Sequence, residues 1–339
     1  MSRKYETPMN SSPFHTDELD AQTLAGGGAS GAGIRRLMHS EQCNFFGLLP
    51  FIFVATADAG GWPLATMLTG QSGFVHACDP FTLRVDALPD RQDAAGARLG
   101  IGQEIGLLGI DFSTRRRNRA NGEIADRNVR GFTVAVSQSF GNCAKYIQRR
   151  VARHAPRLPG SVDLLSALDA KARALILNAD TLFVASRSRP QAGAAGGLDI
   201  SHRGGRPGFV AVDGDCLFIP DFPGNRYYNT LGNLLGEPRG SLLFIDFDNG
   251  DLLQLQGFAT INWSAHAGAF QGAERLWRFQ IVRGWRRHAA CPLHWSFIDQ
   301  SPHTLKTGGW DRSRLRQTAF GDGEMPESAA TAGCTQEML

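Results

Sequence analysis

One ten-residue segment, Asp199–Gly208 (DISHRGGRPG), combines more polar side chains and glycines than any other part of the chain. Glycine lets a ligand approach the backbone closely, while serine, histidine and arginine donate hydrogen bonds to phosphate or carbonyl oxygens. A basic surface turn would use the same residue types. We interpret the segment as part of a site for an anionic ligand, with these candidates: Ser201, His202, Arg203 and Arg206.

A second polar segment, Asp221–Thr230 (DFPGNRYYNT), precedes a helix that we expect over Arg226–Leu235. Free backbone N–H groups and the dipole at a helix start favour a bound anion. Ordinary capping of the helix by an asparagine explains the same letters. The candidate binding residues of this segment are Asp221, Asn225, Arg226 and Asn229.

A compact basic run, Thr114–Arg119 (TRRRNR), lies in the first half of the chain. On a strand, Arg115, Arg117 and Arg119 would share one face, and the guanidinium fork matches phosphate oxygens. A solvated edge strand is the structural alternative, because edge strands use charge to block pairing. Nucleic-acid binding is disfavoured, since no aromatic residues interleave with the run. We retain Arg117 as a candidate site residue.

Other motifs predict no chemistry. Gly26-x-Gly28-x-x-Gly31 follows a polar stretch instead of an apolar strand, so a loop explains it better than dinucleotide binding. The segment from His39 to Cys43 (HSEQC) lacks the second element of a deaminase zinc site and is interpreted as a surface helix end. Six scattered cysteines without C-x-x-C spacing indicate neither a disulfide framework nor a structural metal site.

The chain also contains an internal repeat. Shifted by 135 positions, Gly70–Gly122 lies on Gly205–Gly257 without a gap, so that LLGIDF at 107–112 falls on LLFIDF at 242–247. A repeat of this length is a whole small domain, and we therefore expect a pseudo-dimer with a ligand at its interface.

The two copies differ in their polar residues. Opposite His202 and Arg203 the first copy has Met67 and Leu68, and opposite Asn229 it has alanine. Arg117 in turn lies opposite a leucine of the second copy. These differences predict one complete anion site per chain, with the second copy as its core and the first copy as an arm.

Several segments resemble the pyridoxamine 5′-phosphate oxidase-like flavin-binding split-barrel family in its tandem, two-barrel form, over about 13–310 of the chain. The matching segments are Ser139–Gln148 (SFGNCAKYIQ), Ala179–Ser186 (ADTLFVAS), Asp199–Val210, Ile219–Arg226, Asn229–Leu234 (NTLGNL) and Leu252–Gly257 (LLQLQG). The resemblance implies a six-stranded antiparallel split barrel in each half, with FMN at the barrel–barrel interface. FAD, a deazaflavin or haem are the alternatives, and His154, His202 and His294 are candidate haem ligands.

The resemblance also implies residue roles. The Ser201–Arg206 strand and turn would hold the flavin phosphate and ring edge, and the Asp221–Arg226 loop would lie on the phosphate side. Gln254 and Gln256 would face the isoalloxazine. The residues that would close the pocket are Asn142, Lys145 and Tyr146. The Arg/Lys strand pattern and the C-terminal substrate-phosphate signature of the oxidases are missing, so pyridoxamine phosphate oxidation itself is not expected. Ala144 stands where relatives tend to have proline, which is a minor change.

We therefore expect a mainly β protein with some α structure (α+β), built as two tandem antiparallel split β-barrels that form a pseudo-dimer. The expected parts are a disordered N-terminus (1–13), a first barrel with N-terminal helices (14–140), an inter-barrel segment and helix (141–178), a second, cofactor-binding barrel (179–310) and a largely disordered tail (311–339). Helices are expected at Asp17–Leu24, Ile34–His39 and from Ser161 to about Asn178. The expected strands are Phe51–Thr56, Gly73–Ala77, Ile105–Phe112, Phe132–Ser137 and their counterparts Thr181–Ser186, Gly208–Val212, Leu242–Phe247 and Leu252–Ile261.

Composition and resemblance together favour a cytoplasmic flavin-dependent oxidoreductase. The net charge of +3 is too small to indicate nucleic acid, and no apolar run is long enough to span a membrane. The expected partners are a small-molecule substrate and NAD(P)H or a separate reductase as electron donor, with pairing of two chains left open. No catalytic residue is identified, and the alternative is a non-catalytic flavin- or haem-binding protein.

Overall fold

The computed structural model describes residues 12–263 and 269–311. The first half of the chain forms an antiparallel sheet of seven strands. In order across the sheet, these are β2 (Pro63–Thr69), β1 (Phe51–Ala57), β5 (Glu104–Asp111), β6 (Arg116–Asn128), β7 (Gly131–Gly141), β4 (Thr82–Val85) and β3 (Val75–Asp79). Alternate side chains such as Ile52, Val54 and Leu107 fill a core that helix α2 (Ser40–Gly47) closes with Phe45 and Phe46.

The second half forms a sheet with the same strand order. Its strands are β11 (Leu198–Gly204), β10 (Thr181–Arg187), β14 (Arg239–Ile245), β15 (Leu252–Asn262), β16 (Arg275–Arg287), β13 (Cys216–Asp221) and β12 (Ala211–Asp213), with β9 (Val162–Leu165) added beside β16. The 135-residue shift carries β2 onto β11 without an offset and β5 onto β14 with an offset of at most one residue. The predicted fold class, two tandem antiparallel split barrels in a mainly β chain, is confirmed, with seven paired strands per copy instead of six.

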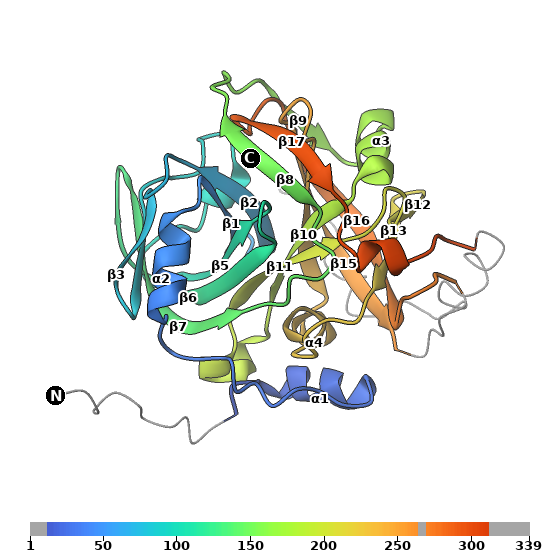
Figure 1. The fold of residues 1–339 in the computed structure, drawn as a ribbon, viewed down its shortest axis with the longest axis horizontal. Coiled ribbons are helices and arrows are strands. Elements are labelled where there is room, and N and C mark those ends of the chain that lie inside the picture. Colours follow the sequence, from blue (N-terminus) through green and yellow to red (C-terminus); the bar gives the residue numbers. More distant parts are fainter. Residues whose placement is uncertain (1–11, 264–268, 312–339) are drawn as a thin grey trace, which may run out of the picture.

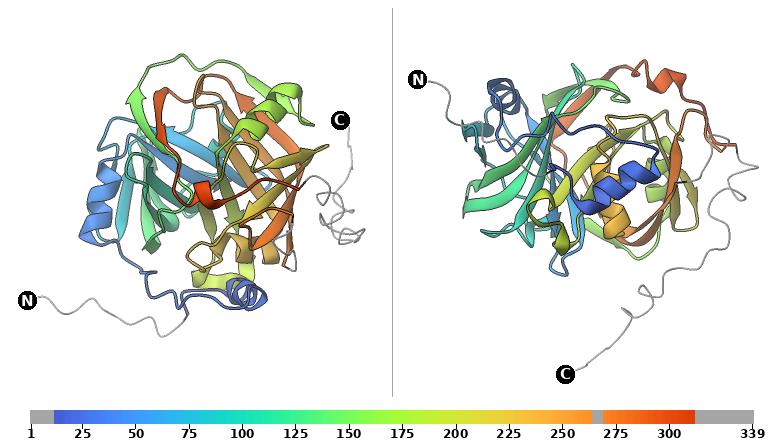
Figure 2. Two further views of the ribbon diagram at one scale, coloured as in Figure 1. Left: turned by 45° about the vertical axis from the view of Figure 1, so that its right-hand side comes forward. Right: turned by 90° about the horizontal axis from the view of Figure 1, so that it is seen from below.

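The two halves face each other across an apolar interface (Figures 1 and 2). Phe53 of β1 and Phe183 of β10 stack there with ring centroids 3.6 Å apart. Gly106 of β5 allows close approach of the second half, because a Cβ at this position would stand 2.8 Å from the carbonyl oxygen of Leu198. Across the interface, β5 contacts β11 and the equivalent strand β14 contacts β2, so the two copies are related by an approximate two-fold axis.

Two further layers complete the fold. Helix α1 (Thr16–Leu24) lies against helix α4 (Asn229–Gly236), below the sheets in Figure 1. Strands β8 (Arg149–His154) and β17 (Leu293–Asp299) form a separate two-stranded antiparallel sheet, and the short 3-10 helices η1 (Ala94–Gly96), η2 (Pro190–Ala195) and η3 (Thr304–Lys306) occur in connections. None of the helices in the described residues is long and apolar enough to cross a membrane.

Several predicted elements need correction. No helix forms over Ile34–His39; the nearby helix α2 begins at Ser40, where Gln42 accepts a hydrogen bond from the backbone of His39. The segment after Ser161 forms strand β9, and helix α3 (Ala170–Asn178) begins later because Asp169 caps it by accepting from the backbone N–H of Ala172.

Helix α4 begins at Asn229 instead of Arg226. Arg226 and Tyr228 adopt positive φ angles of 60° and 59°, which lie outside the right-handed helical region, so the helix starts only after them. The basic run is not an edge strand, because β6 lies between β5 and β7; Arg115 precedes it with a φ of 60°. Most of the two predicted disordered tails, 1–11 and 312–339, lies outside the described residues, and the domain boundaries stay a prediction.

Candidate functional site

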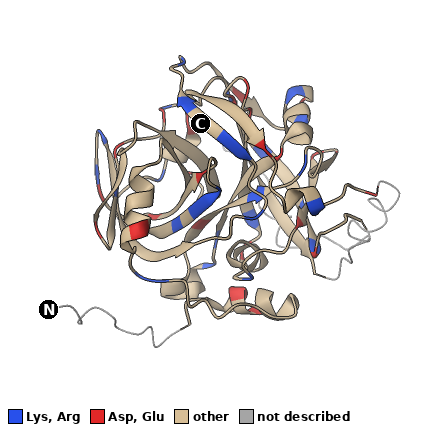
Figure 3. Cartoon of the chain, viewed as in Figure 1, with Lys and Arg blue, Asp and Glu red and all other residues tan. Residues whose placement is uncertain are grey.

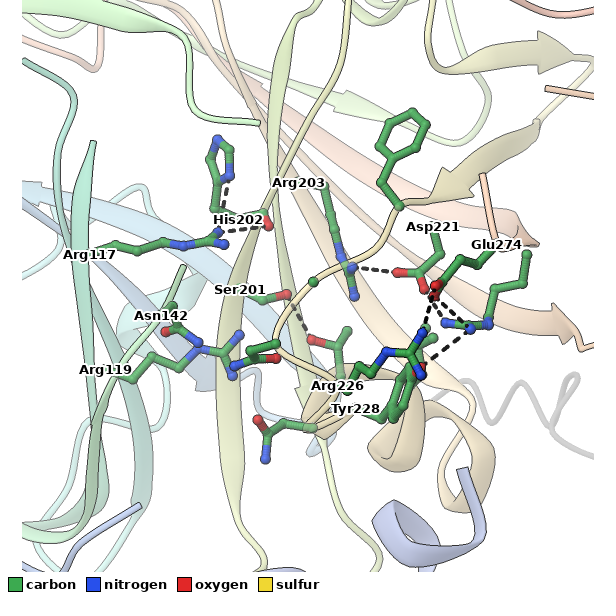
Figure 4. Close-up of a pocket in the computed structure, with 17 residues that line it drawn as sticks. Arg117, Arg119, Asn142, Ser201, His202, Arg203, Asp221, Arg226, Tyr228 and Glu274 are labelled. Atoms are coloured by element: carbon green, nitrogen blue, oxygen red, sulfur yellow. Dashed lines mark hydrogen bonds and ion pairs between the residues drawn. The ribbon is translucent and has the colours of Figure 1, made fainter. Parts of the chain in front are cut away.

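A pocket of about 80 Å³ lies between the two halves (Figure 4). The first half contributes β6 and the residue just after β7, and the second half contributes β11, the loop before α4, the start of α4 and the start of β16. The lining residues are Arg117, Arg119, Asn142, Ser201, His202, Arg203, Asp221, Phe222, Gly224, Asn225, Arg226, Tyr228, Asn229, Thr230, Leu231, Glu274 and Arg275. Nine predicted residues are among them: Asn142, Arg117, Ser201, His202, Arg203, Asp221, Asn225, Arg226 and Asn229.

Arg117 reaches from β6 toward the second half and is partly buried. Its Nε donates to the carbonyl oxygen of Cys143 at 2.8 Å, and its Nη1 lies 3.3 Å from Nδ1 and 3.4 Å from the carbonyl oxygen of His202. Burial lowers the pKa of Arg117 to about 10, with the nearby Arg119 and Arg203 acting in the same direction. Within the described residues, no carboxylate lies within ion-pair distance of this guanidinium. Arg117 is therefore a partly desolvated cation without an anionic partner.

Arg119, two residues further along β6, is buried and paired. Its Nη1 donates to Oδ2 of Asp199 at 2.5 Å, while the amide of Asn121 donates to Oδ1 of the same carboxylate at 3.1 Å. The period of two along a strand thus places Arg117, Arg119 and Asn121 on one face of β6, which is directed at the second half. Of the three arginines predicted to share one face, Arg117 and Arg119 lie on β6, whereas Arg115 precedes the strand and donates to the carbonyl oxygen of Ile147.

On β11, Ser201 and Arg203 point to the same side, as alternate residues of a strand do. Arg203 Nη1 donates to Asp221 Oδ1 at 2.5 Å, and Arg275 Nη1 donates to Asp221 Oδ2 at the same distance. Glu274 accepts from Arg275 at 3.0 Å and from Arg226 at 3.3 Å. The two acids hold three arginines around one side of the pocket (Figure 4).

The start of α4 forms the floor of the site. Thr230 Oγ1 donates to Ser201 Oγ at 2.8 Å, and Asn225 Oδ1 accepts from the backbone N–H of Tyr227 at 3.2 Å. The first backbone N–H groups of a helix have no intrahelical acceptor. The two left-handed residues just before α4, Arg226 and Tyr228, are the kind of local strain that persists at binding sites.

Four buried polar atoms of lining residues have no hydrogen-bond partner: Nε of Arg119, Nε of Arg203, Nε2 of His202 and Oδ1 of Asn142. Buried polar groups of folded proteins are normally paired, so their concentration around one cavity points to a missing polar group. The lining holds five arginines against Asp221 and Glu274, which gives it an excess of positive charge. The Nε atoms of Arg119 and Arg203 are donors that the oxygen atoms of an anion would satisfy, whereas Oδ1 of Asn142 is itself an acceptor.

His202 is buried, and burial holds the pKa of its imidazole well below the ordinary value, with Arg117 and Arg203 acting in the same direction. Its ring packs edge-on against Phe112 and Phe183 and is turned away from the centre of the pocket (Figure 4). Because a guanidinium only donates, Nδ1 accepts from Arg117 and the proton is on Nε2. His202 is therefore a neutral, positioned acceptor for Arg117.

Five predicted site residues do not line the pocket. Lys145 lies close to it and donates to the carbonyl oxygen of Pro223 at 3.5 Å, and Tyr146 stacks on the lining residue Phe222 with centroids 5.0 Å apart. Burial raises the pKa of Tyr146 to about 12. Arg206 donates instead to carbonyl oxygens of η3, at 2.5 Å for Leu305.

Gln254 and Gln256 are fully buried on β15 and contact strand β2 of the first half instead of the pocket. The Gln254 amide donates to the carbonyl oxygen of Ala65 at 2.9 Å and to Asp93 at 3.0 Å. The Gln256 amide donates to Asp58 at 3.2 Å and to the carbonyl oxygen of Pro63 at 3.0 Å. These contacts direct both amide nitrogens to the first half, although the buried Oε1 of Gln254 has no hydrogen-bond partner. We therefore leave the two glutamines out of the site proposed below.

The repeat gives the pocket a counterpart at the other end of the interface, and the two glutamines lie at this counterpart. The shift of 135 puts Gln254 opposite Arg119, Thr66 opposite Ser201 and Asp93 opposite Tyr228. There Asp93 is buried and accepts from Arg287 at 2.7 Å, from Gln254 and from Thr66. At this counterpart of the pocket, the donors Arg287, Gln254 and Thr66 are therefore already paired with a carboxylate of the chain. One site per chain stays a prediction.

Sequence reasoning missed several lining residues, above all Glu274 and Arg275. Neither belongs to a motif; Arg275 reaches the site because β16 pairs with β13, which sets it opposite Asp221. The candidate haem ligands His154 and His294 lie exposed on the β8–β17 sheet and not at the pocket. No group of three or more His, Cys, Asp or Glu residues suited to a metal ion occurs in the described part of the chain, where all five cysteines are free.

The fold and the pocket define a tandem split-barrel protein with an arginine-rich site between its halves. No protein-family model matches the chain, and no curated protein sequence matches it. Among solved structures, HupZ of Group A Streptococcus aligns at 13% identity over 35% of this chain and 98% of its own, with a TM-score of 0.28. An FAD-binding protein from Mesorhizobium loti aligns at 14% identity over 37% of this chain and 97% of its own, with a TM-score of 0.25. The fold assignment therefore rests on the strand order of the chain itself.

Proposed function

We propose that the chain is a flavin-dependent oxidoreductase of the pyridoxamine 5′-phosphate oxidase-like split-barrel type, which holds the phosphate of FMN in the pocket between its halves. The observation that carries the proposal is Arg117, whose partly desolvated guanidinium has no carboxylate partner within the described residues. Keeping such a charge away from water is costly unless a counter-charge arrives. A phosphate group supplies that charge, and the sequence resemblance supports a flavin as its carrier.

The residues present fit a phosphate group. The pocket volume of about 80 Å³ corresponds to roughly two or three water molecules, which is enough for a phosphate but not for a flavin ring system. Arg117, Arg119 and Arg203 present guanidinium groups to it, and Ser201 and the first N–H groups of α4 add neutral donors.

A bound flavin supplies one- and two-electron transfer, and the protein orients it and excludes water. In this chain, Asp221 fixes Arg203 and Arg275 while Asp199 fixes Arg119, so the charged groups are held in place before a ligand binds. We further propose a small-molecule substrate, with NAD(P)H or a separate reductase as electron donor. These partners rest on the resemblance alone.

The proposal is tested with the purified full-length protein. We expect a yellow preparation that absorbs at about 450 nm and releases FMN on denaturation, identified by mass spectrometry. Riboflavin, which lacks the phosphate, is the matched control ligand and should bind at least about tenfold more weakly than FMN in equilibrium dialysis, since charge-assisted contacts are lost. Equal affinity for the two would overturn the assignment of the pocket to phosphate. A haem spectrum, or a preparation that binds no flavin, would overturn the flavin assignment.

A further inference from the structure

A buried carboxyl group lies directly behind the pocket and takes no part in the contacts described so far. Glu18 of α1 is only 3% exposed and packs against α4, where its Oε1 accepts from the amide of Asn229, a residue that lines the pocket. Its Oε2 accepts from the backbone N–H of His15 at 3.0 Å, as in a helix capping box. Figure 3 shows acidic residues near the start of α1, the helix that lies beside α4.

Among the described residues, no lysine or arginine lies within ion-pair distance of this carboxyl group. The nearest basic atom within ion-pair distance is Nε2 of His15, 3.7 Å away, but this atom lies 2.9 Å from Oδ1 of Asn233, and burial lowers the pKa of His15. Arg119 is already paired with Asp199.

The groups that face Glu18 come from three packed elements besides α1. They are Asn229 and Asn233 of α4, Asp199 of β11, and Arg119 and Asn121 of β6; on α1 itself, His15 and Asp17 lie beside it, and Asp17 is paired with Arg189. A void of about 10 Å³, room for at most one water, lies among them. Burial raises the pKa of Glu18 to about 8, with the Asp199 carboxylate acting in the same direction and the hydrogen bond from Asn229 opposing it.

We propose that Glu18 is a positioning residue of the anion site and that the pocket binds an anion only while this carboxyl group is neutral, so that binding takes up one proton from solvent. The inference rests on the proposed phosphate site. An ionised Glu18 would place a negative charge next to Asn229 and Arg119, at the wall of the pocket, where it would repel a bound anion and compete for Arg119. Protonation of the carboxylate removes that charge.

A purely structural role would be different. As a capping residue of α1, Glu18 would affect the free energy of unfolding but not the pH dependence of ligand binding. The distinguishing measurement is therefore the dissociation constant of an anion that does not itself titrate between pH 7 and 9. Sulfate meets this condition, and its binding does not depend on whether the natural ligand is a flavin.

Sulfate binding is measured by calorimetry on the full-length protein at pH 7, 8 and 9, in buffers of different ionisation enthalpy. If only the protein with neutral Glu18 binds, a pKa of about 8 gives a dissociation constant about tenfold higher at pH 9 than at pH 7, with net proton uptake near pH 8. The isosteric variant Glu18→Gln should bind at all three pH values as the wild type does at pH 7, without proton uptake. Cys143→Ser, which removes the thiol 3.6 Å from Nη2 of Arg117, should keep the wild-type profile.

A wild-type profile that is flat, or one that persists in Glu18→Gln, would overturn the inference. Circular dichroism at each pH confirms that both variants are folded. Sulfate binding without FMN binding would contradict the proposed flavin function and leave the role of Glu18 testable. No sulfate binding at any pH would contradict both the anion site and the role of Glu18.

Discussion

Replacing Arg117 by methionine should weaken ligand binding and leave the ligand-free protein at least as stable as the wild type. The pKa of Arg117, lowered from its ordinary 12.5 to about 10 by burial, corresponds to a penalty of about 3 kcal/mol for keeping the charge in the folded state. This penalty applies at neutral pH, where the guanidinium is charged in both the folded and the unfolded protein. Arg117→Met removes it.

The loss of the hydrogen bonds to Cys143 and His202 offsets about 1–2 kcal/mol of this gain. We therefore expect the free energy of unfolding of Arg117→Met to rise by about 1 kcal/mol or to stay unchanged in urea denaturation without ligand. The dissociation constant of FMN should rise at least about tenfold, because one charge-assisted contact is lost. A gain or retention of stability together with a loss of affinity is typical of a residue kept for binding.

Arg119→Met is the matched control. It lies two residues away on the same face of the same strand, but its removal leaves the buried Asp199 without its cation, which should cost about 3–5 kcal/mol of stability. The reasoning is refuted if Arg117→Met destabilises the protein as much as Arg119→Met does, or if it binds FMN as the wild type does.

Three further predictions follow from the packing. Arg287→Met leaves the buried Asp93 without its cation and should cost about 3–5 kcal/mol in urea denaturation, while calorimetry still gives one FMN per chain with unchanged affinity. Gly232→Ala places a Cβ 2.5 Å from a Cα of α1, so the helices must separate, and we expect a loss of about 1–3 kcal/mol in spite of the better helix propensity of alanine. His288 has a raised pKa, chiefly from its hydrogen bond to Asp163, so its stabilising effect is fully present below about pH 6.5 and is lost as pH rises through the raised value. The difference in unfolding free energy between wild type and His288→Asn should therefore be larger at pH 6 than at pH 8.5; an equal difference at both would contradict the assignment.

The two-barrel architecture could be predicted because the sequence contains an internal repeat, so that each half could be compared with the other. The repeat matched Gly70–Gly122 with Gly205–Gly257, and the structure places equivalent strands at equivalent positions in both sheets. Element boundaries were wrong where a local interaction decided them. The cap at Asp169 sets the start of α3, and the left-handed conformation of Tyr228 sets the start of α4. The spacing of apolar residues, from which the helices were predicted, indicates neither feature.

The site was predicted where its residues are close in sequence and missed where strand pairing supplies them. The polar residues before α4 stand out as a cluster, whereas Arg275 enters the pocket only through its pairing opposite Asp221, 54 residues earlier in the chain. Gln254 does not line the pocket, and the repeat gives the reason. It is the counterpart of Arg119, so the approximate two-fold relation puts it at the counterpart of the pocket.

That relation also accounts for the difference between the two ends of the interface. The two ends of the interface are built from equivalent strands. At the pocket, β6 faces β11, and at the other end the equivalent strand β15 faces β2. At the end formed by β15 and β2, Asp93 accepts hydrogen bonds from Arg287, Gln254 and Thr66, so the charge of Arg287 is neutralised by a residue of the chain. At the other end, a tyrosine occupies the position of that aspartate, and Arg117 stays without a carboxylate among the described residues. Asp93 therefore neutralises Arg287 at the first end, whereas the uncompensated charge of Arg117 at the second end supports the proposed anion site.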